Sequence, residues 1–151
     1  VQQTVRDLPV TVHTMDGRNP SFEYQFDRVL VDAPCSGLGA LRRRPEARWR
    51  KQESDIAQLA QLQYELLASA INLTRPGGVI VYSTCSPDLR ETRGVVNKAL
   101  ENHPVVELDA HPLVPNMENI GEGKSVQMWP HRHHTDAMFF AVLKKTPEKL
   151  G

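Results

Sequence analysis

The stretch Phe26-Asp-Arg-Val-Leu-Val-Asp-Ala-Pro-Cys-Ser-Gly-Leu-Gly39 decides the fold. It begins as a nearly continuous apolar, β-branched run, which predicts a strand covered on both faces in a parallel sheet. The run stops at Pro34 because proline cannot donate to the hydrogen-bond ladder. We therefore expect this strand to deliver Asp32 and Cys35 to a crevice at its carboxyl end.

A second stretch repeats the pattern about fifty residues later. Pro76-Gly-Gly-Val-Ile-Val-Tyr-Ser-Thr-Cys-Ser-Pro87 predicts another buried strand, and it ends in Cys85. Between the two strands, apolar residues at helical spacing predict a helix from Ser54 to about Leu73. The strand, helix, strand succession implies a parallel pair with a right-handed crossover. Ligands bind beyond the carboxyl ends of such strands, so the carboxylate and both thiols are expected to share one cleft.

The remaining segments fit one α/β domain over residues 1–145, with a tail at 146–151. Pro87 and Asp88 are expected to open a second helix, with Asp88 as its N-cap. A long loop is expected at 111–123. Alternation and apolar runs predict further strands or extended pieces at 10–14, 105–108, 125–130 and 138–143.

Composition limits the compartment and the type of site. Eighteen basic and eighteen acidic residues give a formal net charge of zero, so affinity for a polyanion would require local clustering. No apolar stretch is long enough to span a membrane and no export signal is visible, which favours the cytoplasm. The two cysteines are expected to be thiols rather than a structural disulfide, because they end two buried strands in a chain with no sign of secretion.

A metal site is not expected. Zinc would need four ligands at recognisable spacing, and the two cysteines do not offer them. The cluster of His131, His133 and His134 has no acidic or cysteine partner at ligand spacing.

The cysteine motifs carry a family resemblance. Asp32-Ala-Pro-Cys-Ser-Gly37 and Ser83-Thr-Cys-Ser86 resemble motifs IV and VI of the Sun/Fmu-type RNA cytosine-5 methyltransferases, a family that includes bacterial 16S rRNA enzymes. Gln63, Pro76-Gly-Gly78 and Pro130-His131 also agree with this family, so the resemblance covers nearly the whole chain. It implies a Rossmann-like class I methyltransferase fold, S-adenosylmethionine as methyl donor and RNA, most directly 16S rRNA, as partner.

The resemblance also implies roles for individual residues. Cys85 would be the thiolate that adds to C6 of cytosine, which activates C5 toward an electrophilic methyl group. Asp32 would supply a proton at N3, and Cys35 would assist loss of the C5 proton. Asp16, Asp32 and Pro34 would lie at the donor site.

The resemblance implies that the chain is the C-terminal part of the catalytic domain. The family's first strands and Gly-rich donor loop have no counterpart here, so the fold is expected to be truncated and the isolated chain inactive. In the family's strand order, 3-2-1-4-5-7-6, strands 4, 5, 7 and 6 should remain contiguous. Residues 1–20 should dock elsewhere or pair with another chain, and exposed sheet edges allow self-association.

A basic segment follows the first cysteine motif. We expect it to contact RNA phosphates, because it adjoins the catalytic loop and contains Trp49. Its basic residues are Arg42, Arg43, Arg44, Arg48, Arg50 and Lys51. The alternative is that the chain is a non-catalytic RNA-binding or interaction fragment, in which this segment persists as a binding surface.

Overall fold

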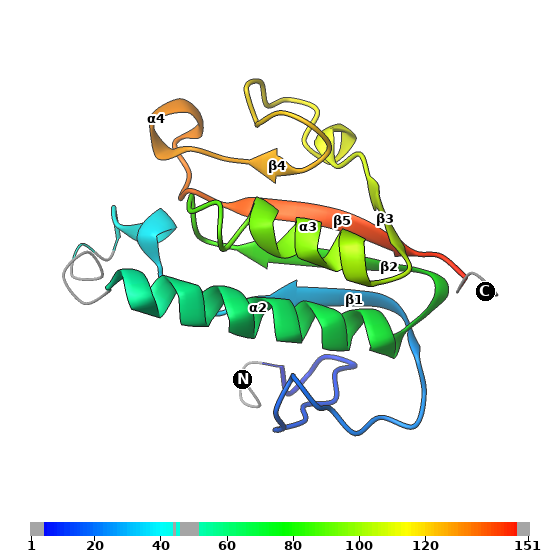
Figure 1. Ribbon diagram of the computed structural model, residues 1–151. Coiled ribbons are helices and arrows are strands. Elements are labelled where there is room, and N and C mark those ends of the chain that lie inside the picture. The colour runs from blue at the N-terminus through cyan, green and yellow to red at the C-terminus, as the bar shows by residue number, and fades with distance from the viewer. Residues whose placement is uncertain (1–4, 44, 46–51, 148–151) are drawn as a thin grey trace.

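The computed structural model describes residues 5–43, 45 and 52–147, and its centre is a five-stranded mixed sheet (Figure 1). Four strands follow the order β1-β2-β5-β3, and β4 pairs with β5 off this path. The strands are β1 (Phe26–Asp32), β2 (Thr74–Thr84), β3 (Val105–Leu108), β4 (Val126–Gln127) and β5 (Phe139–Lys145). The helices are η1 (Leu38–Ala40), α2 (Glu53–Leu73), α3 (Arg93–Asn102), η2 (His111–Leu113) and α4 (Pro130–His133).

The two predicted cysteine-bearing strands form the expected parallel pair. β1 and β2 run side by side with Val31 opposite Tyr82 and Asp32 opposite Ser83, and α2 makes the crossover between them. β5 runs antiparallel to β2 and also to β3, so it lies between them. The order β1-β2-β5-β3 is the predicted contiguity of strands 4, 5, 7 and 6, which is therefore confirmed.

The main core lies between this sheet and the two long helices, which cover the same face (Figure 1). Alternate residues of β2, Ile80 and Tyr82, point into this core and are fully buried. From α2, Leu67 and Ile71 pack against them with no exposed surface. Burial of these large side chains is worth about 1.5–3 kcal/mol each, so this layer holds the strand ends of the site in place.

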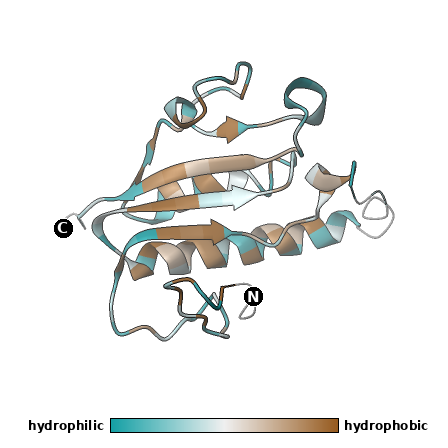
Figure 2. Ribbon diagram, turned by 180° about the vertical axis from the view of Figure 1, so that it is seen from behind, coloured by the Kyte–Doolittle hydropathy of each residue, from teal (hydrophilic) through white to brown (hydrophobic). Residues whose placement is uncertain are grey.

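The opposite face of the sheet is only partly covered. The segment after β3 contributes Ala110, Ile120 and Val126, which form a second buried cluster with Val142 of β5. Within the described part of the chain, no helix lies over β1 and β2 on this side (Figure 2). Leu30 is 68% exposed there. The predicted strand is confirmed, but the prediction that it is buried on both faces is wrong, because no described segment covers Leu30 on this face.

The segment before β1 is irregular. The strand predicted at residues 10–14 is absent there, since these residues form no ladder. They lie with residues 15–22 along the edge of β1 and the side of α2, where a Cβ at Gly17 would come within 2.9 Å of Leu66 Cδ2. Docking of this segment away from a strand position is one of the two predicted outcomes.

Two element boundaries differ from the predictions. Asp88 does not cap a helix: its carboxylate accepts from the backbone N–H of Arg90, in a turn that precedes α3 by several residues. β2 begins at Thr74 rather than at Val79, because residues 75–78 bulge out opposite Asp27, and a bulge tolerates Pro76.

The loop predicted at 111–123 contains the short helix η2, and the predicted extended piece at 125–130 contains β4. The sequence did not predict α4, which follows β4. None of the helices in the described residues combines the length and the apolar character needed to cross a membrane.

Candidate active site

The carboxyl ends of β1 and β2 bring the two cysteines into contact, as the sequence predicts. The Sγ atoms of Cys35 and Cys85 lie 2.9 Å apart, and the Cys35 thiol also lies 3.6 Å from the backbone oxygen of Cys85. Both thiols are half-buried and free. The contact follows from the parallel register, because Asp32 lies opposite Ser83 and each cysteine comes a few residues later.

The contact shifts the acidity of the two thiols in opposite directions. A hydrogen bond from Cys85 lowers the pKa of Cys35 to about 6, helped by the Thr84 side chain and the Gly37 amide, although burial opposes the shift. The same contact, together with burial and the nearby charge of Asp32, raises the pKa of Cys85. Either sulfur atom can donate to the other, and these opposite shifts favour Cys35 as the thiolate and Cys85 as the donor.

The predicted acid Asp32 ends β1 on the exposed side of the strand. It lines a groove of about 450 Å³ between the segment 11–22, β1 and α2, whose other lining side chains are mostly apolar. The charge of its carboxylate contributes to the raised pKa of Cys85. The carboxylate and the two thiols therefore meet at one end of the sheet.

The other two predicted donor-site residues, Asp16 and Pro34, are not among the residues that line this groove. Met15 and Gly17 line the groove on either side of Asp16, whose carboxylate is ion-paired with Arg18 at 2.7 Å. Hydrogen bonds from Arg18 lower the pKa of Asp16 to about 2. Pro34 is exposed, and its carbonyl accepts from Gln63 Nε2 at 2.8 Å.

Gly39 ties the loop after β1 to two neighbouring segments. Its backbone N–H donates to Cys85 O at 3.0 Å, and its carbonyl accepts from the Ala137 N–H at 2.8 Å. A Cβ at this position would lie 2.5 Å from Cys85 O and would also clash with Ala137 O. Glycine at residue 39 therefore allows the loop to approach the Cys85 backbone closely.

A buried polar network behind the thiols was missed by the sequence analysis. The Glu91 carboxylate has no exposed surface and accepts hydrogen bonds from Ser36, Gln63 and Ser86. Gln63 gave a signal, because it is a polar residue on the same helical face as Ile56, Leu67 and Ala70. Glu91 gave no such signal, because it lies in the segment where a helix was predicted to begin.

The described part of the basic segment lies near this end of the sheet. Arg42 and Arg43 line a groove of about 280 Å³ with His134, Thr135 and Asp136. Arg43 is exposed and ion-paired with Asp136. This pairing raises the pKa of Arg43. The other predicted RNA contacts, Arg44, Arg48, Arg50 and Lys51, lie outside the described residues, as does Trp49.

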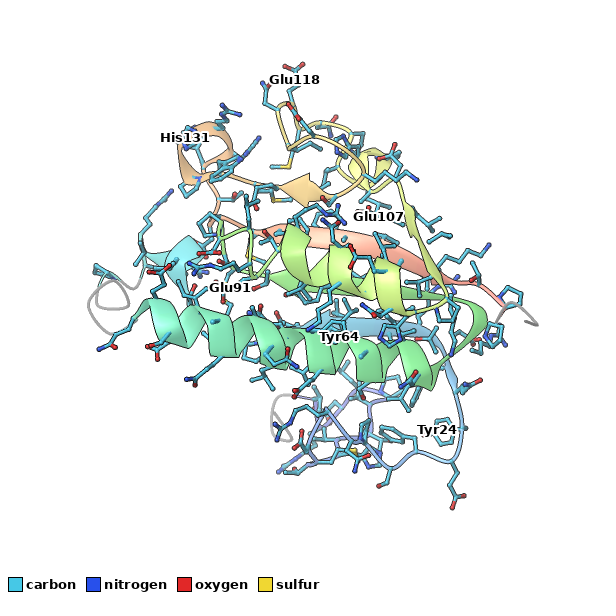
Figure 3. The ribbon with its side chains drawn as sticks, in the orientation of Figure 1. Tyr24, Tyr64, Glu91, Glu107, Glu118 and His131 are labelled. Atoms are coloured by element: carbon cyan, nitrogen blue, oxygen red, sulfur yellow. The ribbon has the colours of Figure 1, made fainter. Side chains whose placement is uncertain are left out.

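The histidines of the predicted cluster lie on and beside α4, away from Glu91 (Figure 3). Both ring nitrogens of His133 have backbone partners. Nδ1 accepts from the Trp129 N–H at 2.9 Å, and Nε2 lies 2.8 Å from Glu118 O. His133 thus joins α4 to the loop before β4.

Comparison with known proteins identifies the family. The family model for 16S rRNA methyltransferase RsmB/F matches residues 1–144 of the chain. The chain belongs to this family. The RsmB/F family consists of RNA methyltransferases, so the resemblance stated from the cysteine motifs is confirmed.

Individual relatives agree with the RsmB/F assignment. A protein of Mycobacterium tuberculosis (strain ATCC 25618 / H37Rv) that is named a methyltransferase is 61% identical over 146 residues, covering 96% of this chain and 32% of that protein. The ribosomal RNA small subunit methyltransferase B of Salmonella newport (strain SL254) is 38% identical over 143 residues, covering 91% and 31%. The chain thus spans about a third of the length of the curated relatives it matches.

Solved structures confirm the predicted fold class. NSun6 from Pyrococcus horikoshii, solved with SFG, superposes with a TM-score of 0.82 at 28% identity and covers 97% of this chain and 37% of that one. The structure of PH0851 gives a TM-score of 0.71 at 37% identity, covering 79% and 26%. The RsmB/F chain therefore has part of a Rossmann-like methyltransferase fold.

Proposed function

We propose that this chain carries the thiol-bearing half of an active site that methylates C5 of cytosine in RNA, with 16S rRNA as the substrate class and S-adenosylmethionine as donor. The observation that carries the proposal is the 2.9 Å contact between Cys35 and Cys85 at the ends of parallel strands. Membership of a family of 16S rRNA methyltransferases supports the substrate class. A ribosomal substrate also favours a cytoplasmic location.

Cys85 forms the covalent bond in this proposal. Its Sγ lies 2.9 Å from Cys35 Sγ, so its proton passes to Cys35 Sγ as Cys85 Sγ bonds to C6 of the base. The reacting form of the site carries a proton on Asp32, which Asp32 donates to N3 as electron density is pushed into the ring. C5 then has enamine character. Because Cys35 is only half-buried, solvent can reach its sulfur atom. Cys35 releases the proton to solvent and becomes a thiolate again.

Bound S-adenosylmethionine would supply an electrophilic methyl group to C5. Cys35 then takes the C5 proton, the bond between Cys85 Sγ and C6 breaks, and the N3 proton returns to Asp32. A final proton transfer from Cys35 to Cys85 restores the starting thiol pair. The cycle releases one proton to solvent, which matches replacement of a ring hydrogen by a methyl group from a sulfonium.

The groove beside Asp32 fits one side of a donor site. It is about 450 Å³, mostly apolar, and has a carboxylate at its edge, a combination suited to a nucleoside. Asp32 would hold the donor from β1, with Pro34 after it and Asp16 from the facing segment. That NSun6 was solved with SFG, an analogue of S-adenosylmethionine, supports this choice of donor. With only this side present, we expect the isolated chain to be inactive.

RNA would reach the thiols past Arg42 and Arg43. Arg43 is exposed and ion-paired with Asp136, and the next residue, Ala137, is hydrogen-bonded to Gly39 in the loop that contacts Cys85, so a phosphate bound there would lie near the reacting base. The rest of the basic segment, with Arg44, Arg48, Arg50 and Lys51, is proposed to contact RNA as well.

Covalent trapping tests the proposal. RNA containing 5-fluorocytosine and labelled S-adenosylmethionine are incubated with the chain and with a full-length protein matching its relatives in length, and adducts are resolved on denaturing gels. We expect an adduct with the full-length protein that is lost in Cys85→Ala and that still forms in Cys35→Ala, but more slowly, because the proton of Cys85 then has to pass to solvent. An adduct that depends on Cys35 instead would reverse the two roles. Absence of any adduct would favour an RNA-binding module.

A further inference from the structure

Glu91 is a fully buried carboxylate whose two oxygens are surrounded by donors. Oε1 accepts from the Ser36 backbone N–H at 2.8 Å and from Gln63 Nε2 at 3.0 Å. Oε2 accepts from the Ser36 hydroxyl at 2.6 Å and from the Ser86 hydroxyl at 2.5 Å. An ionised carboxylate only accepts, so four donors match its chemistry.

The donors place the carboxylate at the junction of the two thiol loops. Ser36 directly follows Cys35 in the loop after β1, and Ser86 directly follows Cys85 in the loop after β2. Each cysteine is therefore one residue away from an anchor on the same carboxylate. The carboxylate therefore links two loops that are far apart in the sequence, because Ser36 and Ser86 are separated by fifty residues.

The chain around Glu91 is itself held from the core side. The Tyr82 hydroxyl donates to the Glu91 backbone oxygen at 2.6 Å, and Tyr82 is fully buried on β2. Gln63, which donates to the carboxylate, also donates to Pro34 O. Figure 3 shows Glu91 in this position, between the α2 and α3 sides of the site. The carboxylate is thus fixed relative to the sheet and to both loops.

We propose that Glu91 is a positioning residue for the thiol pair: its buried carboxylate clamps the loops after β1 and β2 together and so sets the contact between Cys35 and Cys85. Its importance for methyl transfer rests on the proposed function, but the clamp itself is a property of this chain. Glutamine could turn its NH₂ group toward the two serine hydroxyls, which are able to accept, so it is not a decisive change. Alanine at this position would remove both acceptor oxygens, and the two serine anchors would then open and the thiols would separate.

The acidity of Cys35 reports this separation. The groups that lower its pKa are Cys85, the Thr84 side chain and the Gly37 amide. Asp32 and Arg43 are charged groups near Cys85, the other member of the pair. The contact with Cys85 has the largest effect, so the Cys35 thiolate should lose stability as the two sulfur atoms move apart. Cys85→Ala removes the partner outright and defines the profile expected for complete loss.

The test measures Cys35 alkylation by iodoacetamide against pH, with peptide mass spectrometry to separate the two thiols. In Glu91→Ala we expect the midpoint to move upward toward that of Cys85→Ala, with Cys35 reacting about fivefold more slowly at pH 6 for the first unit of pKa increase. Glu107→Ala is the matched control. Glu107 is a largely buried carboxylate on β3 that is ion-paired with Arg93 of α3, so its loss should leave the profile unchanged.

A Glu91→Ala profile that overlays the wild type in a folded protein would overturn the proposal, and so would an equal shift in Glu107→Ala. Folding is checked by circular dichroism and urea denaturation. If Glu91→Ala fails to fold, Ser86→Ala decides, because it removes one anchor only: a shifted midpoint supports the clamp and an unchanged one rejects it. The assay uses neither RNA nor methyl donor, so its outcome is independent of the trapping experiment.

Discussion

Replacing Gly39 with alanine should destabilise the protein by about 2–4 kcal/mol. The new Cβ would lie 2.5 Å from Cys85 O and clash with Ala137 O, and both contacts are with backbone. Inserting a methyl group into such a tight contact costs about 1–3 kcal/mol. The two backbone hydrogen bonds of Gly39 are each worth about 0.5–1.5 kcal/mol, and relief of the clash stretches them. The φ angle of Gly39 is not in the left-handed region, so steric contact is the whole cause.

Urea denaturation followed by circular dichroism measures this loss, and Gly123→Ala is the matched control. Gly123 has a φ of +78° and open space where a Cβ would be. Its substitution should cost about 1 kcal/mol through backbone conformation alone. The argument is refuted if Gly39→Ala loses no more stability than Gly123→Ala. Cys35 alkylation in the same samples should slow in Gly39→Ala only, because only that change displaces the Cys85 backbone.

Two further predictions concern the thiols and the open edge of the sheet. The free energy of unfolding should rise between about pH 6 and pH 9.0, because folded Cys35 has a pKa of about 6 and has lost a proton that the unfolded chain still holds up to its ordinary value of 9.0. Urea titrations at each pH should show this rise in the wild type and a flatter curve in Cys85→Ala; equal curves would contradict it. Self-association through β1 should produce a concentration-dependent mass in light scattering that Leu30→Lys abolishes, since Leu30 is 68% exposed on the edge strand.

The central part of the fold was predictable because local and long-range signals agree there. The apolar run of β1, the helical spacing of α2 and the glycine pair before Val79 all specify the same parallel unit, and the structure confirms it. The meeting of Cys35 and Cys85 followed directly, because parallel strands end at one edge. Predicting that the two thiols meet required only the positions of Cys35 and Cys85 relative to the ends of their strands.

Other features depend on contacts that a single segment does not encode. Residues 10–14 alternate as a strand does, but no neighbouring strand in the described chain pairs with them, so they remain irregular. Leu30 belongs to an apolar run, yet its exposure depends on what covers the sheet. Glu91 looks like a helix-start residue. Its burial arises because donors from two distant segments, Ser36 and Gln63, converge on it together with the nearby Ser86, which local spacing does not reveal.

The central position of β5 constrains when the sheet can form. β5 comes after all the other strands in the chain, yet β2, β3 and β4 each pair with it. During synthesis, β1 and β2 can join while the inner edge of β2 stays open until residue 145 has left the ribosome. Such late, non-local pairing is slow and leaves an aggregation-prone edge in the nascent chain. Deleting residues 139–145 would therefore leave β3 and β4 without a partner and β2 paired on one side only, and a nascent chain paused before them is a natural target for chaperones.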